Sequence, residues 1–195
     1  MNSLSNQKQI LRTQTRVNLS ASEKRFADIQ ITKSLMSLRV YKNAKSICTY
    51  VSMPSEVNTH QIIREALLAK GSIIIPKVQG ITLELYSIRS FEELSIGPYG
   101  FLEPHIRRAH VPIQTIDLFI IPGLAFGRDG SRLGTGKGYY DRLLQDVHVP
   151  VIGLSYDRQL FDTIPHSAKD KKIDIIITET HIYDFNITPL RSKNL

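Results

Sequence analysis

The chain has 195 residues, of which 42% are hydrophobic, and these values are typical of one compact domain, residues 1–195, with a substantial core. No apolar run is long enough to span a membrane, and the polar, basic N-terminus lacks the hydrophobic stretch of a signal peptide, so we expect no membrane association. The formal net charge of +7 is spread along the chain without a recognition-helix pattern, so a polyanionic small molecule explains it as well as a nucleic acid does.

Two helices are predicted at the N-terminus. The first covers residues 3–17, and its Lys8 and Arg12 lie four residues apart on one face, a spacing that is also common on solvated surfaces. The second begins at the capping box Ser20–Glu23 and runs to about Leu38. The side chains expected on the apolar sides of the two helices are Leu4, Ile10, Leu11, Phe26, Ile29, Leu35 and Leu38.

Short apolar runs bounded by polar, glycine or proline residues predict buried strands. The runs cover residues 46–51, 73–75, 83–86, 118–121, 151–154 and 173–178. Helices are expected over residues 59–71, between the N-cap Thr59 and Gly71, and over residues 139–145. Residues 87–116 are predicted to be mostly loop, because they combine weak periodicity with several glycines and prolines. This alternation predicts a single three-layer α/β/α sandwich, Rossmann-like, with a parallel or mixed central sheet.

The only cysteine, Cys48, lies inside the first apolar run. A lone cysteine forms no disulfide framework, which favours the cytoplasm. We therefore expect Cys48 to fill the core and to have no chemical role.

A glycine-rich stretch between residues 123 and 138 holds six of the eleven glycines and follows the apolar run 118–121. Glycine lets backbone N–H groups approach a ligand closely, and a helix N-terminus favours an anion. Four cations strengthen this interpretation: Arg128, Arg132, Lys137 and Arg142. A P-loop would need Ser or Thr after Lys137, where Gly138 stands, and the dinucleotide pattern also fails. The stretch is therefore a phosphate loop of another kind or a structural surface loop.

The stretch PGLAFGRDGSRLGTGKGYYD closely resembles the signature of the 5-formyltetrahydrofolate cyclo-ligase family, also called methenyltetrahydrofolate synthetases. Three further segments lie where that family carries its other motifs: KQILR at Lys8–Arg12, SEVNT at Ser55–Thr59, and KDKKIDIIITE near the end. The resemblance thus spans nearly the whole chain. It implies an enzyme that uses MgATP to convert 5-formyltetrahydrofolate to 5,10-methenyltetrahydrofolate through a phosphorylated formyl group, with release of ADP and phosphate.

The resemblance also implies roles for single residues. It places ATP on Lys8, Arg12, Arg132, Leu133, Gly134, Thr135, Gly136, Lys137, Gly138, Tyr139 and Tyr140. It places the folate on Val51, Glu56, Thr135, Gly136, Lys137, Gly138 and Tyr139, with the Glu56 carboxylate accepting two N–H bonds from the pterin ring. Lys137 and Arg132 would be the catalytic charge stabilisers, while Asp141 and Asp170 would hold Mg²⁺. The expected partner is this small molecule alone, bound by a monomer.

Several family members have an arginine where this chain has Thr135, so one phosphate contact is expected to be missing or to come from Lys137 or Arg128. Tyr99 and Phe101 are candidates for stacking on a flat ring, and Lys77 either faces solvent or lines the pocket. Two other functions stay open. One is a paralogue that keeps the ATP loop but acts on another small metabolite, and the other is a basic nucleotide-binding module without catalysis.

Overall fold

The computed structural model describes residues 3–15, 18–98, 100–105, 110–167 and 170–186. Its helices are α1 (Leu4–Gln14), α2 (Ala21–Ser37), α3 (Arg39–Asn43), α4 (His60–Lys70) and α5 (Tyr139–Leu143), with 3-10 turns η1 (Phe91–Glu93), η2 (Ile113–Thr115) and η3 (Asp157–Gln159). Its strands are β1 (Ile47–Thr49), β2 (Ile73–Gln79), β3 (Thr82–Ile88), β4 (Leu94–Ile96), β5 (Leu102–Pro104), β6 (Leu118–Ile121), β7 (Ala125–Gly127), β8 (Arg132–Leu133), β9 (Val151–Leu154), β10 (Leu160–Phe161), β11 (Ile175–Ile177) and β12 (Ile182–Asp184). None of the described helices combines the length and hydrophobicity that crossing a bilayer requires.

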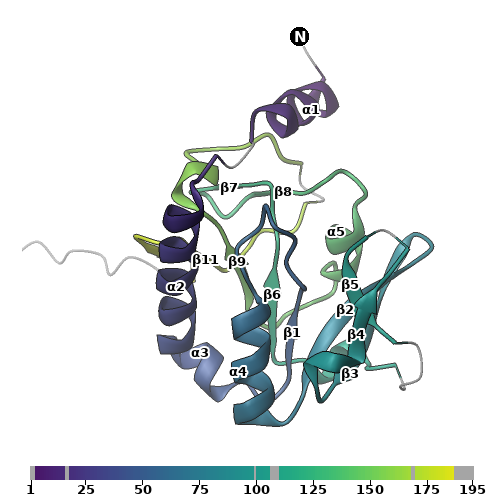
Figure 1. The fold of residues 1–195 in the computed structure, drawn as a ribbon. Helices are drawn as coiled ribbons and strands as arrows, with labels where there is room; N and C mark the ends of the chain where they lie inside the picture. The colour runs from purple at the N-terminus through teal and green to yellow at the C-terminus, as the bar shows by residue number, and fades with distance from the viewer. Residues whose placement is uncertain (1–2, 16–17, 99, 106–109, 168–169, 187–195) are drawn as a thin grey trace, which may run out of the picture.

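The main sheet has the strand order β12-β11-β9-β6-β1-β2-β3 (Figure 1). Its five inner strands are parallel, while β3 and β12 pair antiparallel at the two edges. The strands β1, β6, β9 and β11 are buried along their whole length, as expected when both faces of a parallel sheet are covered. The predicted α/β fold with a mixed, largely parallel central sheet is confirmed.

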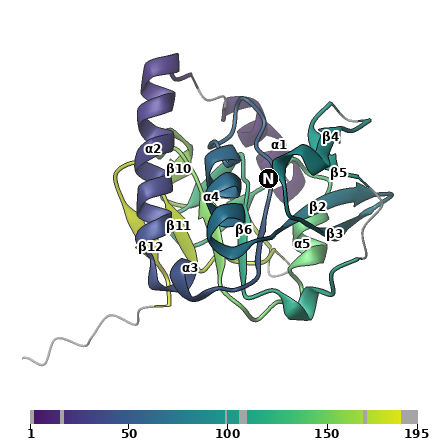
Figure 2. The same ribbon diagram turned by 60° about the horizontal axis from the view of Figure 1, so that its bottom comes forward.

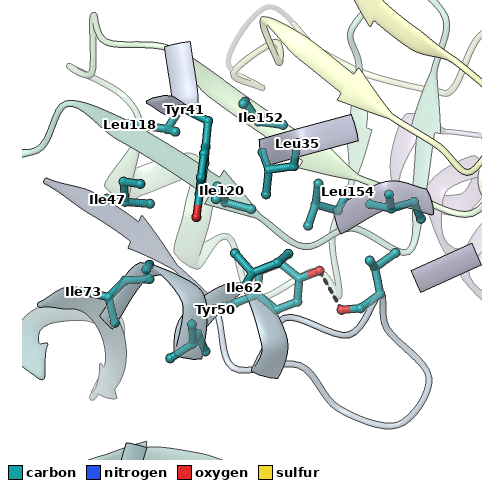
Figure 3. Close-up of a cluster of buried hydrophobic side chains, with 14 of the residues drawn as sticks. Leu35, Tyr41, Ile47, Tyr50, Ile62, Ile73, Leu118, Ile120, Ile152 and Leu154 are labelled. Carbon is teal, nitrogen blue, oxygen red and sulfur yellow. Dashed lines mark hydrogen bonds between the residues drawn. The ribbon is translucent and has the colours of Figure 1, made fainter. Parts of the chain in front are cut away.

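Alternating strand residues divide the core into two parts, one on each face of the sheet. Ile47, Leu118 and Ile120 pack with residues of α2 and α4 on one face, and Figure 3 shows this cluster. Cys48 and Phe119 belong to the cluster on the other face, which α5 covers through Tyr140, Leu143 and neighbouring residues. The period of two is what a strand buried on both faces requires.

The buried face of α2 differs from the predicted one. Phe26 and Ile29, which we expected to point inward, are 62% and 47% exposed. The helix instead buries Ala27, Ile31 and Leu35. Residues four apart lie on one side of a helix, so this stripe leaves Phe26 and Ile29 outside it. The capping box of Ser20 and Glu23 and the inward position of Leu35 are confirmed.

Helix α1 is shorter than predicted and buries no residue. Leu4 and Ile10, expected on its apolar side, are 39% and 47% exposed, and residues 16 and 17 lie outside the described part of the chain. Leu11 does pack against a small cluster of Ala125, Leu133 and Ile164. The helix therefore lies beside β7 and β8, away from the main core, as Figure 1 shows.

Residues 87–116, predicted to be mostly loop, contain the β4–β5 hairpin and two 3-10 turns. Most of the described segment is irregular or 3-10 turn, as predicted, but the hairpin was missed because strands of three residues give no clear sequence period. The hairpin lies beside β2 and β3 (Figure 2). The β2–β3 pair is longer than predicted, with seven residues in each strand.

The glycine-rich stretch folds partly into a small sheet of β10, β7 and β8. The ring of Phe126 in β7 packs directly against Gly123 and Gly153. A Cβ atom on Gly123 would lie 2.6 Å from this ring, and one on Gly153 would lie 2.4 Å from it, so neither position has room for a side chain. These two glycines therefore create the space in which the aromatic ring packs against the main sheet. Part of the glycine cluster thus serves packing, and only its last part remains available for a ligand.

Candidate active site

Two adjoining cavities lie where β1 and β6 end, at the carboxyl edge of the parallel strands. In open α/β sheets this edge is the usual place for ligands. The first, which we call the polar cavity, has a volume of about 190 Å³ and is lined by Lys8, Arg12, Arg132, Leu133, Gly134, Thr135, Gly136, Gly138, Tyr139, Tyr140, Asp141 and Asp170. The second, the apolar cavity, has a volume of about 380 Å³ and is lined by Tyr50, Val51, Met53, Glu56, Pro76, Val78, Leu83, Phe101, Leu102, Pro122, Thr135, Lys137, Tyr139 and Tyr140.

Three residues form the wall that the cavities share: Thr135, Tyr139 and Tyr140. Every residue predicted to bind ATP lines the polar cavity except Lys137, which lines the apolar one. Of the residues predicted to bind folate, Gly136 and Gly138 line only the polar cavity, and the others line the apolar cavity. The structure thus brings the predicted residues together and places Lys137 on the folate side.

Two cations of the polar cavity, Lys8 and Arg132, are paired with its two carboxylates. Lys8 Nζ lies 2.6 Å from Asp170 Oδ2, and Arg132 Nη2 lies 2.9 Å from Asp141 Oδ1. Partial burial raises the pKa of Asp170, but hydrogen bonds from Lys8 and from the Ser167 N–H outweigh this and lower the pKa below its ordinary value. Each of the two carboxylates predicted to hold Mg²⁺ therefore has a lysine or arginine partner.

Arg132 is the most buried cation of the polar cavity, with 7% of its surface exposed. Its Nη1 donates to Pro122 O at 3.3 Å, and its guanidinium lies 5.5 Å from the ring centre of Tyr140. Its Nε has no partner among the described residues. A buried donor left unpaired is costly, so this N–H group is available to a further acceptor.

The backbone of the loop is shaped by Gly136 and Gly138, whose φ angles are +95° and +68°. Side chains with a Cβ atom rarely adopt these values. The helix that follows, α5, has only five residues, so its dipole contributes less to anion binding than we predicted. The positive charge of the cavity comes mainly from Lys8, Arg12 and Arg132.

Helix α1 reaches the loop through Arg12, whose Nε donates to Gly134 O at 3.0 Å. Arg12 thus contacts the glycine loop, while Lys8 pairs with Asp170 on the same cavity. The shared helical face predicted for Lys8 and Arg12 is thus turned toward the glycine loop and is not a free solvated surface.

Glu56 lies in the loop after β1, at the apolar cavity. Its Oε2 accepts a hydrogen bond from the Met53 N–H at 2.8 Å, while its own N–H donates to Met53 O. Burial raises the pKa of Glu56, and the Met53 N–H and the charge of Lys24 offset only part of this rise. A half-buried carboxylate in a mainly apolar cavity is suited to accept N–H bonds from a flat polar ring.

Thr59 does not cap α4 with its side chain as predicted. Its Oγ1 donates to Tyr50 O at 2.7 Å and accepts from the Ser52 N–H at 3.0 Å. The threonine therefore ties the loop that carries Glu56 to the end of β1. Gly71 ends α4 with a positive φ of 75°, as predicted.

Several lining residues could not be assigned from the sequence. Lys77 is buried and pairs with Glu103, so it neither faces solvent nor lines either cavity. Phe101 lines the apolar cavity, and Tyr99 lies outside the described residues. Pro76, Val78 and Leu102 also line this cavity because the β2–β3 and β4–β5 hairpins form its side. Nothing in the sequence indicated that these strand residues line a cavity.

A larger cavity, of about 680 Å³, lies beyond Tyr139 between β3, η2 and the segment after α5. Its lining is mainly apolar, and it shares Tyr139 and Leu83 with the site but contains no other predicted site residue. Volume alone would single out this cavity. The convergence of charged groups identifies the two smaller cavities as the candidate site.

The two predicted metal ligands fit Mg²⁺ only in part. Asp141 and Asp170 line the same cavity, but the described residues include no cluster of three or more potential metal-ligating side chains. Mg²⁺ commonly takes one or two carboxylates and completes its octahedron with water and substrate phosphates. The pair is therefore consistent with Mg²⁺ that also takes ligands from a nucleotide.

The fold and the paired cavities define an α/β protein with a candidate small-molecule site at the carboxyl edge of its sheet. Residues 4–179 match the model of the 5-formyltetrahydrofolate cyclo-ligase family. The chain belongs to this family, and it is an enzyme of the ligase class.

Named relatives cover most of the chain. 5-Formyltetrahydrofolate cyclo-ligase of Mus musculus is 30% identical over 175 residues, which are 83% of this chain and 86% of that protein. The NMR structure of Aquifex aeolicus 5,10-methenyltetrahydrofolate synthetase matches with a TM-score of 0.84 at 34% identity, over 94% of this chain and 95% of that one. The structure of a 5,10-methenyltetrahydrofolate synthetase from Mycoplasma pneumoniae matches with a TM-score of 0.71 at 27% identity. The match covers 88% of this chain and 98% of that one.

Proposed function

We propose that this protein uses MgATP to cyclise 5-formyltetrahydrofolate to 5,10-methenyltetrahydrofolate, with release of ADP and phosphate. The observation that carries the proposal is the pair of cavities with a common wall. One cavity gathers Lys8, Arg12 and Arg132, and the other combines apolar side chains with the Glu56 carboxylate. A phosphate chain in the first cavity would point its terminal group toward a folate in the second.

The size of each cavity supports this division. Pockets for drug-sized ligands usually measure about 300–1,000 Å³. The polar cavity, at about 190 Å³, suits part of a ligand such as a phosphate chain, whereas the apolar cavity, at about 380 Å³, suits a flat ring. Glu56 would accept the N–H groups of the pterin, and Tyr139 and Tyr140 would form the floor beneath it.

The chemistry requires activation of an unreactive formamide. Transfer of the γ-phosphoryl group to the formyl oxygen converts that oxygen into part of a leaving phosphate. N10 of the folate then attacks the formyl carbon, loses its proton, and closes the ring as the carbon–oxygen bond to phosphate breaks. The protein's contribution is positioning and charge stabilisation, and no side-chain nucleophile is needed.

Each residue has a task in this scheme. Lys8, Arg12, Arg132 and the loop N–H groups would bind the phosphate chain, and the unpaired Nε of Arg132 would gain an acceptor. Lys137, at the apolar cavity, would stabilise the charge on the group being transferred. Mg²⁺, held by Asp141 and Asp170, would neutralise phosphate charge. Thr135 lies in the shared wall and, unlike the arginine of several family members, supplies no charge there.

The proposal is tested by the absorbance of the methenyl product after the protein is mixed with MgATP and 5-formyltetrahydrofolate. We expect turnover that requires both ATP and Mg²⁺. Folded protein that gives no product at any concentration would contradict the folate reaction and favour a paralogue with another substrate. Tight binding of oligonucleotides with steep salt dependence would instead favour the non-catalytic basic module.

A further inference from the structure

A buried tyrosine outside both cavities touches the loop that carries Glu56. Tyr156 follows β9 by two residues and has no exposed surface. Its hydroxyl lies 2.7 Å from Asp28 Oδ1 and 3.0 Å from the carbonyl oxygen of Glu56, and so donates toward both acceptors. The backbone of Glu56 is therefore linked to helix α2 through a single phenol group.

Asp28 completes this link from the helix side. Its Oδ1 also accepts the Asn58 N–H at 3.0 Å, and its Oδ2 pairs with Lys24 Nζ at 2.9 Å. Lys24 lies 5.5 Å from the ring centre of Tyr156. One carboxylate from α2 thus holds the loop on both sides of Val57, directly at Asn58 and through Tyr156 at Glu56.

The part of the loop that precedes Val57 depends on such contacts because it lies outside the core. Residues 53–55 are exposed, and Glu56 is only half-buried. Inside the loop, Tyr50 donates to Val57 O at 3.2 Å. Val57 anchors the loop in the core, and hydrogen bonds fix the exposed backbone on either side of it. The Glu56 carboxylate, outside the core, is held by the contacts of its own backbone and by the Met53 N–H.

We propose that Asp28 and Tyr156 are positioning residues that aim the Glu56 carboxylate into the apolar cavity for the folate ring. The inference rests on the proposed function. Neither residue lines a cavity, so both would act only through Glu56. A substrate ring that donates two N–H bonds to one carboxylate tolerates little displacement of that carboxylate. A displacement of about 1 Å can lower the rate about a hundredfold.

The test compares Tyr156→Phe and Asp28→Asn with the wild type in steady-state kinetics. Tyr156→Phe removes the hydroxyl, and Asp28→Asn removes the negative charge and one acceptor oxygen, each with almost no change in volume. We expect the KM for 5-formyltetrahydrofolate to rise about tenfold, as for loss of a hydrogen bond to a charged group, while the KM for MgATP changes less than about twofold. Tyr41→Phe is the matched control, because it removes the hydroxyl of another buried tyrosine in the same core cluster and should leave both KM values unchanged.

A double variant separates positioning from general loss of structure. If Tyr156 acts through Glu56, Tyr156→Phe should have almost no further effect on the folate KM in a Glu56→Gln background. Additive effects, or equal rises in both KM values, would overturn the positioning role. If Tyr156→Phe does not fold, Asp28→Asn decides alone. A wild type without turnover contradicts the proposed function itself, whereas active variants with an unchanged folate KM contradict only this inference.

Discussion

Lys137 lies on the folate side of the site, between two glycines that line the polar cavity. Its side chain lines the apolar cavity, while its carbonyl oxygen accepts a hydrogen bond from Arg142 Nη2 at 2.9 Å, which fixes the backbone. We expect Lys137→Ala to lower kcat by about two orders of magnitude, the usual cost of removing a preorganised charge stabiliser. Lys33→Ala, which changes an exposed lysine of α2, is the control. Unchanged kcat in Lys137→Ala would exclude the catalytic role.

Glu56 has opposite effects on binding and on stability. Burial raises its pKa, so the folded state favours the protonated form, and the charged form at neutral pH destabilises the fold. We expect Glu56→Gln to weaken folate binding with ATP affinity retained, and to raise Tm at pH 7. The gain in Tm should shrink as pH falls through the raised pKa, because the wild-type carboxyl then becomes neutral as well.

Thermal unfolding at several pH values and separate titrations with each ligand measure both effects. Glu65→Gln, an exposed glutamate of α4, is the matched control and should show neither. Loss of affinity for ATP and folate together would contradict the division of the site into two cavities. A lower Tm for Glu56→Gln at neutral pH would mean that the hydrogen bond to Met53 outweighs the burial of the charge.

At the scale of elements, the β4–β5 hairpin is fastened to β2 by a buried ion pair. Lys77 Nζ lies 2.8 Å from Glu103 Oε1 and donates to Pro104 O at 3.1 Å, with both side chains at most 10% exposed. Breaking such a pair from one side leaves an uncompensated charge. We expect Lys77→Met to lower the free energy of unfolding by about 3–5 kcal/mol and to raise the folate KM, since the hairpin carries Phe101 and Leu102.

Urea unfolding measures the loss of stability, and the double variant Lys77→Met/Glu103→Leu should recover most of it, because it replaces both charges with apolar groups. Asp162→Asn serves as the control, since Asp162 pairs with Arg128 at the surface with 97% of its side chain exposed. A stability loss in Lys77→Met no greater than in Asp162→Asn would show that the Lys77–Glu103 pair does not hold the hairpin.

The sequence predicted some elements much better than others. Strands such as β6 and β9 form continuous apolar runs with polar or proline boundaries, and both were predicted with the bounds they have. Periodicity failed where elements are very short, as in β4, or where the apolar residues of a helix do not share one stripe, as with Phe26 and Ile29. In those elements, tertiary packing decides which side is buried, and a local sequence pattern carries no information about it.

For the site, sequence similarity supplied residue identities that chemistry alone could not. Spacing placed Lys8 and Arg12 on one helical face but left open whether that face met the glycine loop. The charge pairing of the polar cavity was also hidden, because Lys8 and Asp170 are 162 residues apart. Likewise, Asp28 gave no sign that it contacts the backbone of the Glu56 loop. Such long-range contacts depend on the complete fold.

On the scale of the whole molecule, α1 is attached mainly through the polar cavity. It buries no residue, and the Lys8–Asp170 pair, the Arg12–Gly134 hydrogen bond and Leu11 provide its contacts with the rest of the described chain. Nucleotide bound between α1 and the glycine loop should therefore stabilise this attachment. At a MgATP concentration one hundred times its Kd, we expect the free energy of unfolding to rise by about 2.7 kcal/mol.

Hydrogen exchange measures where this stabilisation lies. MgATP should slow amide exchange in α1 much more than in α4, and Lys8→Ala should reduce the effect. AMP, which lacks the β- and γ-phosphates, is the matched control and should protect α1 little. Equal protection throughout the chain, or none in α1, would mean that the nucleotide does not bind between this helix and the loop.

The single cysteine has a practical consequence for such measurements. Cys48 lies in the central strand β1 with 2% of its surface exposed, and burial raises the pKa of its thiol well above the ordinary value. Native protein should therefore react very slowly with maleimide or with Ellman's reagent. A cysteine engineered at Ser5 would then be labelled almost alone, so that a fluorophore there could follow the docking of the N-terminal helix in real time without prior removal of the natural thiol.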